Sequence, residues 1–155
     1  MKYQLELEID RPREAVVALF LDPENLTLWQ PDMVRCEQTG GGDPAAVGAR
    51  LKQIHRMGRQ QVEMIRTVTR NECPDAFGVT FQTDSIWNLI ESRFLDIDGK
   101  RTKWQVDAEF RCSGVFLKLM MLISPGMFRG QTLKFMQRFK AFAERGSGYS
   151  ELRSS

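Results

Sequence analysis

Two residues of this sequence, His55 and Arg66, could contribute acid–base or ionic chemistry. His55 is the only histidine, so a His-rich metal site is excluded and a nucleophilic triad would depend on this one side chain. Near neutral pH an imidazole can act as a general acid or base, or it can orient a ligand. The alternative role is that of a hydrogen-bonded residue in a cavity wall or at a strand end.

Arg66 stands in a mostly apolar pattern, where a guanidinium group requires a partner. A ligand carboxylate or phosphate would be a fitting partner, because guanidinium groups bind these anions through paired hydrogen bonds. The alternative is an arginine at a strand edge whose head reaches water. His55 and Arg66 are therefore the two candidates for a catalytic role, and no other residue stands out as catalytic.

Other polar side chains fall into two groups. Asn88 and Ser92 alternate with Ile90, and they could orient an apolar ligand or simply bond the backbone or water. Asp107 and Glu109 share a strand face with basic residues and are predicted to point outward. We interpret them as solvated charges rather than as a catalytic carboxylate pair.

The overall composition limits the classes of function. A chain of 155 residues suffices for one domain that buries roughly two thirds of its unfolded surface. With 22 basic and 20 acidic residues the net charge is +2, too small to attract nucleic acid at long range. Cys36, Cys73 and Cys112 form no CxxC pair and fit a reducing compartment. We expect a cytoplasmic protein with no metal, no cofactor and no nucleic-acid partner.

Hydrophobic periodicity indicates an α+β fold. A period of two over residues 3–9 predicts a first strand, and two short helices begin at Pro12 and Pro23. Six further strands are predicted at 33–38, 49–57, 60–70, 77–81, 86–94 and 103–111. A long amphipathic helix follows them. A curved antiparallel sheet closed by one long helix tends to enclose a cavity.

The turn Gly58-Arg59 predicts the register of two neighbouring strands. A two-residue connection with glycine first suits a type II′ turn, which makes Met57 and Gln60 face the same side. Propagating this register places eight side chains toward the interior: Leu51, Gln53, His55, Met57, Val62, Met64, Arg66 and Val68.

The final helix carries an apolar stripe with the helical period. Its members are Phe128, Thr132, Phe135, Met136, Phe139, Phe142 and Ala143. Pro125-Gly126 either kinks a longer helix that starts near Val115 or separates two helices. We expect a single domain over residues 1–145 and a flexible tail over 146–155, where the residues are small and polar.

The Met-rich segment 115–128 is too apolar on all sides for the surface helix of a free monomer. It is also too short and too interrupted to span a bilayer. We expect it to cap the cavity or pack against it. A dimer face and transient contact with a membrane surface are the alternatives, so the chain would be a monomer or a homodimer.

Local motifs and the element order together resemble a known family. The motifs are Asp-Pro-Glu-Asn-Leu at 22–26, Trp29, Pro31, a glycine-rich loop, Gly48 before the third strand, and Phe139-Lys140 with Glu144 in the last helix. Over residues 1–145 the chain resembles the START-like (SRPBCC) superfamily, and within it the polyketide cyclase/dehydrase and lipid-transport proteins. The resemblance implies a helix-grip fold of order β-α-α-β6-α. In that fold a seven-stranded curved antiparallel sheet surrounds the C-terminal helix and leaves a hydrophobic tunnel between them.

The resemblance implies no single reaction, because members of the superfamily include lipid and sterol carriers, ubiquinone-binding proteins, polyketide cyclases and hormone receptors. No catalytic signature of these proteins maps onto this sequence, which favours binding over catalysis. We expect binding or transport of a small hydrophobic ligand, such as a lipid, a polyketide or a quinone-like molecule. One alternative is a cyclase or dehydratase that uses His55 as proton shuttle and Arg66 as anion anchor. Another is a protein–protein adaptor that acts through segment 115–128.

The expected ligand site combines apolar and adaptable side chains with a few polar ones. Its predicted members are Trp29, His55, Met57, Met64, Arg66, Asn88, Ser92, Trp104, Phe110, Phe128, Phe135, Met136 and Phe139.

Overall fold

The computed structural model describes the backbone of residues 1–154 and the side chains of residues 1–145. The elements run in the predicted order, with one short 3₁₀ helix, η1, added before α2. They are β1 (Lys2–Ile9), α1 (Arg13–Leu21), η1 (Pro23–Asn25), α2 (Leu26–Trp29), β2 (Met33–Thr39), β3 (Arg50–Met57), β4 (Gln60–Glu72), β5 (Ala76–Gln82), β6 (Ile86–Asp96), β7 (Thr102–Cys112), α3 (Val115–Ile123) and α4 (Pro125–Ser154). The tail predicted over 146–155 lies outside the described side chains. It stays a prediction, as does the domain boundary at residue 145.

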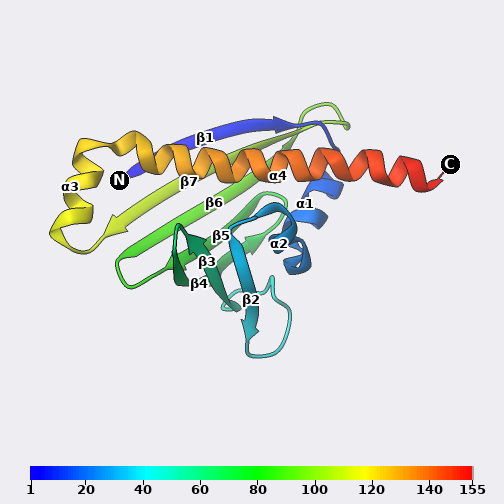
Figure 1. Cartoon of the computed structure of the whole chain (residues 1–155). Helices are drawn as coiled ribbons and strands as arrows, with labels where there is room; N and C mark the ends of the chain where they lie inside the picture. The colour runs from blue at the N-terminus through cyan, green and yellow to red at the C-terminus, as the bar shows by residue number, and fades with distance from the viewer. Residues whose placement is uncertain (155) are drawn as a thin grey trace.

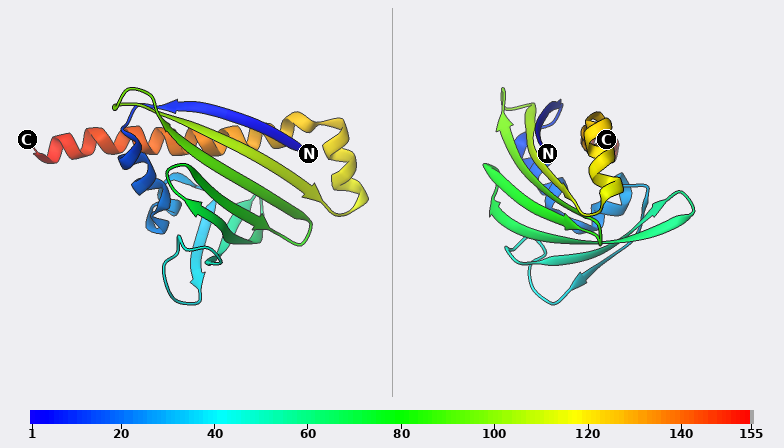
Figure 2. Two further views of the ribbon diagram at one scale, coloured as in Figure 1. Left: turned by 180° about the vertical axis from the view of Figure 1, so that it is seen from behind. Right: turned by 90° about the vertical axis from the view of Figure 1, so that its left-hand side faces the viewer.

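The seven strands form one antiparallel sheet in the order β1-β7-β6-β5-β4-β3-β2. The first strand therefore pairs with the last, and β2 forms the opposite edge. The sheet curves around α4, and α1 and α2 lie at the end of the molecule away from α3 (Figures 1 and 2). This arrangement confirms the predicted α+β helix-grip fold.

Strand β7 shows how a simple pattern produces the sheet. Thr102, Trp104, Val106, Ala108 and Phe110 are buried, and the residues between them are more exposed. Successive side chains of a strand point to opposite faces, so one face of β7 meets the core and the other meets water.

The β3–β4 hairpin contains the predicted two-residue turn. Met57 pairs with Gln60, and Gly58 takes a φ of +65°, which the first position of a type II′ turn requires. Met57 itself was expected to face the interior, and this prediction is wrong, since the residue is 64% exposed. It lies past the end of β2, whose pairing with β3 begins at His55, so neither β2 nor the core covers it.

The other side chains of this hairpin that were predicted to point inward are more buried than Met57. Their burial decreases toward the turn. Leu51, Gln53, Arg66 and Val68 are buried, and His55, Val62 and Met64 are half-buried. The period of two thus predicts the direction of each side chain but not how deeply it is covered.

An aromatic cluster fills the centre of the fold. Phe20 of α1 contacts the rings of Phe77, Phe94, Trp104 and Phe139 at centroid distances of 5.2 to 5.8 Å. Edge-to-face ring pairs of this kind contribute about 0.5–1.5 kcal/mol beyond the area they bury. Phe20 therefore joins α1, the sheet and α4 into one core.

The predicted stripe of α4 is buried against the sheet. Phe128, Thr132, Met136, Phe139 and Ala143 are buried, and Phe135 and Phe142 are half-buried. Pro125 is the first residue of α4, so Pro125-Gly126 separates two helices rather than kinking one. Helix α3 stands across the beginning of α4 at one end of the molecule (Figure 1).

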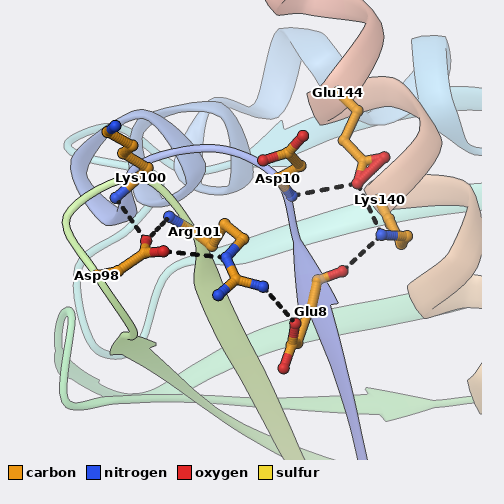
Figure 3. A network of polar contacts seen from close by, with 7 residues as sticks. All are labelled: Glu8, Asp10, Asp98, Lys100, Arg101, Lys140 and Glu144. Carbon is orange, nitrogen blue, oxygen red and sulfur yellow. Dashed lines mark hydrogen bonds and ion pairs between the residues drawn. The ribbon is translucent and has the colours of Figure 1, made fainter.

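Polar contacts hold the later part of α4 against β1 (Figure 3). Lys140 Nζ donates to the backbone oxygen of Glu8 at 2.6 Å and to the carboxylate of Glu144 at 2.7 Å. Glu144 Oε1 also accepts from the backbone N–H of Asp10 at 3.1 Å. From the β7 side, Arg101 reaches the Glu8 carboxylate at 3.4 Å. Helix and first strand are thus joined by a continuous set of polar contacts.

Candidate ligand-binding site

A small cavity of about 20 Å³ lies between the sheet and α4. Its walls come from α1, α2, four strands and α4: Phe20, Leu26, Trp29, Gln30, Gln53, Arg66, Val79, Phe81, Ile90 and Phe135. Such a volume holds about one water molecule. Side chains therefore nearly fill the interior that the resemblance predicted to be a tunnel.

Arg66 is the charged residue of the cavity wall. Strand β4 places it in one row of the sheet, between Leu51 of β3 and Phe81 of β5, and it is 8% exposed. Within the described residues its guanidinium makes no hydrogen bond or ion pair, and it lies 5.7 Å from the ring centroid of Phe77. Burial lowers the pKa of Arg66 to about 10, so the group stays cationic at neutral pH. The wall thus contains a buried positive charge without a counter-charge.

Two hydrogen-bond donors of the same wall also lack a partner within the described residues. They are the indole Nε1 of Trp29 and the amide Nε2 of Gln53. His55 Nε2 lies 3.1 Å from Gln53 Oε1, which engages the amide oxygen and leaves the NH₂ group without an acceptor. Buried donors nearly always find an acceptor. Arg66, Trp29 and Gln53 would all be satisfied by oxygen atoms placed in the cavity.

His55 does not line the cavity. It contacts Gln53, which does. It lies opposite Met33 of β2 and is half-buried. Burial lowers the pKa of His55, and the nearby Asp32 carboxylate opposes this effect, so the imidazole is neutral at pH 7. The two catalytic candidates, His55 and Arg66, therefore do not line a common space in this structure.

Further buried polar atoms lie outside the cavity wall. Asn88 Oδ1, Ser92 Oγ and Trp104 Nε1 are buried and have no hydrogen-bond partner within the described residues. Asn88 belongs to the same row of the sheet as Arg66, with Phe81 between them. Asn88 could therefore contact a ligand only if that ligand extended past Phe81.

The other predicted site residues are distributed over the interior. Trp29, Arg66 and Phe135 line the cavity, and Trp104, Met136 and Phe139 belong to the core. Phe110 and Phe128 pack on each other beside Tyr3. Met64 pairs with Gln53 across β3 and β4. Met57 lies outside, as described above. The structure thus brings three of the predicted residues together around one space.

Sequence reasoning missed several residues of the wall. Gln53 was predicted to point inward but was not assigned to the site, although a long polar side chain at an inward position usually has a partner there. Phe20, Leu26, Gln30, Val79, Phe81 and Ile90 also line the cavity. The apolar ones have the same pattern as core residues, so no sequence signal distinguishes them.

A larger, open groove of about 470 Å³ lies on the outside, between α2 and α4. It is lined by Leu28, Trp29, Pro31, Lys134, Gln137, Arg138, Ala141 and Arg145. Trp29 contributes to both spaces, and its ring packs on Phe135 at 4.8 Å and on Phe139 at 5.2 Å. The Trp29 side chain therefore forms part of the wall between the outer groove and the interior.

Within the residues that the structure describes, no group of three or more His, Cys, Asp or Glu side chains is arranged to hold a metal ion. In the same part of the chain, no helix is long and apolar enough to cross a membrane. Cys36, Cys73 and Cys112 carry free thiols, and burial raises the pKa of each.

The sheet order and the enclosed C-terminal helix define the helix-grip fold, which the chain shares with a START superfamily protein. The chain belongs to the family described as polyketide cyclase / dehydrase and lipid transport, whose sequence profile matches residues 1–144. This match confirms the predicted resemblance.

Solved structures share the whole fold at low sequence identity. TTHA0849 from Thermus thermophilus has a TM-score of 0.76 at 13% identity, covering 95% of this chain and 99% of that one. The Zhui aromatase/cyclase from a Streptomyces species has a TM-score of 0.76 at 10% identity, covering 94% of each chain. A START superfamily protein from Mycobacterium smegmatis has a TM-score of 0.69 at 16% identity, covering 93% of this chain and 97% of that one. These likenesses show the fold alone, and the sequence matches no curated protein.

Proposed function

We propose that this protein binds a small, mostly apolar molecule that carries an anionic or carbonyl oxygen, between the sheet and α4. The observation that carries the proposal is Arg66, a buried cation without a counter-charge. Burying an unpaired charge is costly, so a ligand that supplies oxygen atoms at this point would gain a strong, directed interaction. Lipids, polyketides and quinone-like molecules all combine an apolar body with such oxygens. The free thiols favour a carrier that works in the cytoplasm.

Such a ligand needs more room than the cavity offers. Sites for small molecules measure about 300–1,000 Å³, against about 20 Å³ here. Trp29 sits on the single-turn helix α2 and separates the cavity from the outer groove. Outward movement of Trp29 would join the two spaces and admit a ligand beside Arg66. Apolar area buried in the joined space would then supply affinity at roughly 25 cal/mol per Å².

Native mass spectrometry of the freshly purified chain tests the proposal directly. We expect a retained small molecule that denaturation releases and that contains a carboxylate, phosphate or carbonyl group. Recovery of an apolar molecule without any such oxygen would contradict the role given to Arg66.

Binding of anilinonaphthalene sulfonate, an apolar fluorescent anion, provides a second test. Arg66→Met should weaken binding at least about tenfold, or about 1.4 kcal/mol, because the charge-assisted contact is lost. Arg50→Met is the matched control, since Arg50 is an exposed arginine of β3. Equal affinity of the two variants would argue against an anion site at Arg66.

A cyclase or dehydratase that uses the same interior is the second candidate. The family and the His55–Gln53 hydrogen bond favour it, since this bond links a neutral imidazole to the cavity wall. If the protein is an enzyme, His55→Ala should abolish turnover of a polyketide-like substrate and leave the fold intact. If it is a carrier, the same variant should change only ligand affinity.

A further inference from the structure

Helix α3 is apolar on both of its sides. Leu117, Met120 and Met121 are half-buried and share the side that faces the protein. The opposite side, here called the α3 outer face, consists of Val115, Phe116, Leu119, Leu122 and Ile123. All five are exposed, Val115 to 83% and Leu122 to 80%. A continuous exposed apolar face of this kind marks an interaction surface.

The position of α3 leaves this face free within the described structure. The helix projects at one end of the molecule, across the beginning of α4 and away from α1 and α2 (Figures 1 and 2). It contains no buried residue. Among the described residues, α3 packs on α4 and contributes no residue to the cavity wall. The expectation that segment 115–128 caps the cavity therefore stays a prediction, and the outer side of α3 remains unexplained.

The charges close to α3 in the sequence are of one sign. No acidic residue occurs between Glu109 and Glu144. The basic residues of the same interval are Arg111, Lys118, Arg129, Lys134, Arg138 and Lys140. Lys118 lies at the border of the α3 outer face, and Arg129 follows in the first turns of α4. Three of these six are ion-paired, Arg111 with Glu109, Arg138 with Asp32 and Lys140 with Glu144, and the neighbouring β5–β6 turn contributes Asp84, so the excess is positive but moderate.

We propose that the α3 outer face docks on the surface of an anionic lipid bilayer. Its aliphatic side chains and Phe116 would enter the boundary between head groups and acyl chains, and Lys118 would contact lipid phosphates. A second copy of the chain fits less well, because a symmetric contact between two α3 outer faces would bring the two Lys118 side chains together with no acidic residue on α3.

Co-sedimentation of the full chain with lipid vesicles tests this proposal. We expect binding to vesicles of equal parts phosphatidylcholine and phosphatidylglycerol. Binding to pure phosphatidylcholine vesicles, or in high salt, should be at least about tenfold weaker because the electrostatic contribution is lost or screened. Lys118→Gln should weaken binding to the mixed vesicles as well.

Two matched leucine variants show whether vesicle binding depends on the α3 outer face or on exposed apolar side chains in general. Leu122→Asp should reduce binding to the mixed vesicles at least about tenfold, since a charge replaces a side chain that would be immersed. Leu28→Asp is the control, because Leu28 is also helical and is 68% exposed, but lies on α2. Both variants should unfold at the same temperature as the original protein, as expected for exposed positions.

Several results would overturn the proposal. They are an absence of binding to the mixed vesicles, equal binding to both kinds of vesicle, or equal losses in the two leucine variants. A concentration-dependent rise in molecular mass without vesicles, abolished by Leu122→Asp, would assign the face to a second copy instead. Leu122→Asp should retain a small ligand as well as the original protein does. The vesicle-binding result therefore tests the α3 outer face independently of the cavity.

Discussion

Two regions between the helices and the sheet differ in how their polar groups are satisfied. Where α4 meets β1, Tyr3 Oη donates to the backbone oxygen of Phe128 at 3.1 Å, and Lys140 bonds to Glu8 and Glu144. Around the cavity lined by α2, β3 and β4, Arg66 and the donor nitrogen of Gln53 have no partner within the described residues.

This difference has a physical consequence. Satisfied polar groups add stability and fix the position of an element, whereas unsatisfied buried groups cost free energy until something binds them. The contact of α4 with β1 therefore has the character of a structural joint. The region around Arg66 has the character of a binding site, and the following substitutions should separate the two.

The largest effect is expected at the aromatic centre that both regions share. Phe20→Ala should lower the free energy of unfolding by about 3–5 kcal/mol, because it removes a ring that packs on four others. Urea denaturation measures this change. The control is Phe116→Ala on the α3 outer face, 73% exposed, which should change stability by less than about 0.5 kcal/mol. Similar losses in both variants would contradict the assigned core.

The next effect has the opposite sign. Arg66→Met should raise the free energy of unfolding of the ligand-free protein by about 1–3 kcal/mol, because it keeps much of the side-chain volume and removes an unpaired buried charge. Urea denaturation in ligand-free buffer would show the gain. A loss of stability would mean that Arg66 has a partner in the folded chain, and the site proposed here would lose its main support.

A smaller loss is expected at the contact of α4 with β1. Lys140→Met removes hydrogen bonds to Glu8 and Glu144 and should cost about 0.5–1.5 kcal/mol, toward the lower end because the side chain is partly exposed. Lys134→Met, on the exposed side of α4, is the comparison and should change little. If Lys140→Met left stability and ligand binding unchanged, the contact would not act as a joint.

The smallest effect concerns His55 and the pH. Its pKa is lowered from 6.5 in the folded protein, mainly by burial. Below pH 6.5 the unfolded chain binds a proton that the folded chain binds only at lower pH, so stability should fall as the pH drops below 6.5. His55→Gln should make stability less dependent on pH in this window, as measured by thermal unfolding. An unchanged pH dependence would indicate that His55 titrates alike in both states.

Much of this molecule could be predicted from sequence patterns. The alternation in β7 and the stripe of α4 predicted the elements, and the Gly58-Arg59 turn predicted the register that points Arg66 inward. These features depend on local geometry, because a period of two or 3.6 and a two-residue turn decide side-chain direction without reference to distant parts of the chain.

The predicted direction of a side chain did not show whether it would be buried or whether its polar groups would find a partner. Met57 and Arg66 were assigned to the same face, yet Met57 is exposed past the end of β2 and Arg66 is buried. Gln53 lines the cavity, and its amide nitrogen has no partner among the described residues while His55 engages its amide oxygen. Such outcomes depend on which segments, far apart in the sequence, cover each position.

The sequence by itself determined the order of the elements, the inner face of the sheet and the family. The tertiary structure decided that aromatic side chains nearly fill the interior, that Arg66 lacks a counter-charge there, and that one apolar side of α3 remains uncovered. The reason is that patterns of a few residues record the local backbone geometry. Cavities, unpaired charges and exposed faces arise from how α1, α2 and α4 pack on strands far from them in the chain.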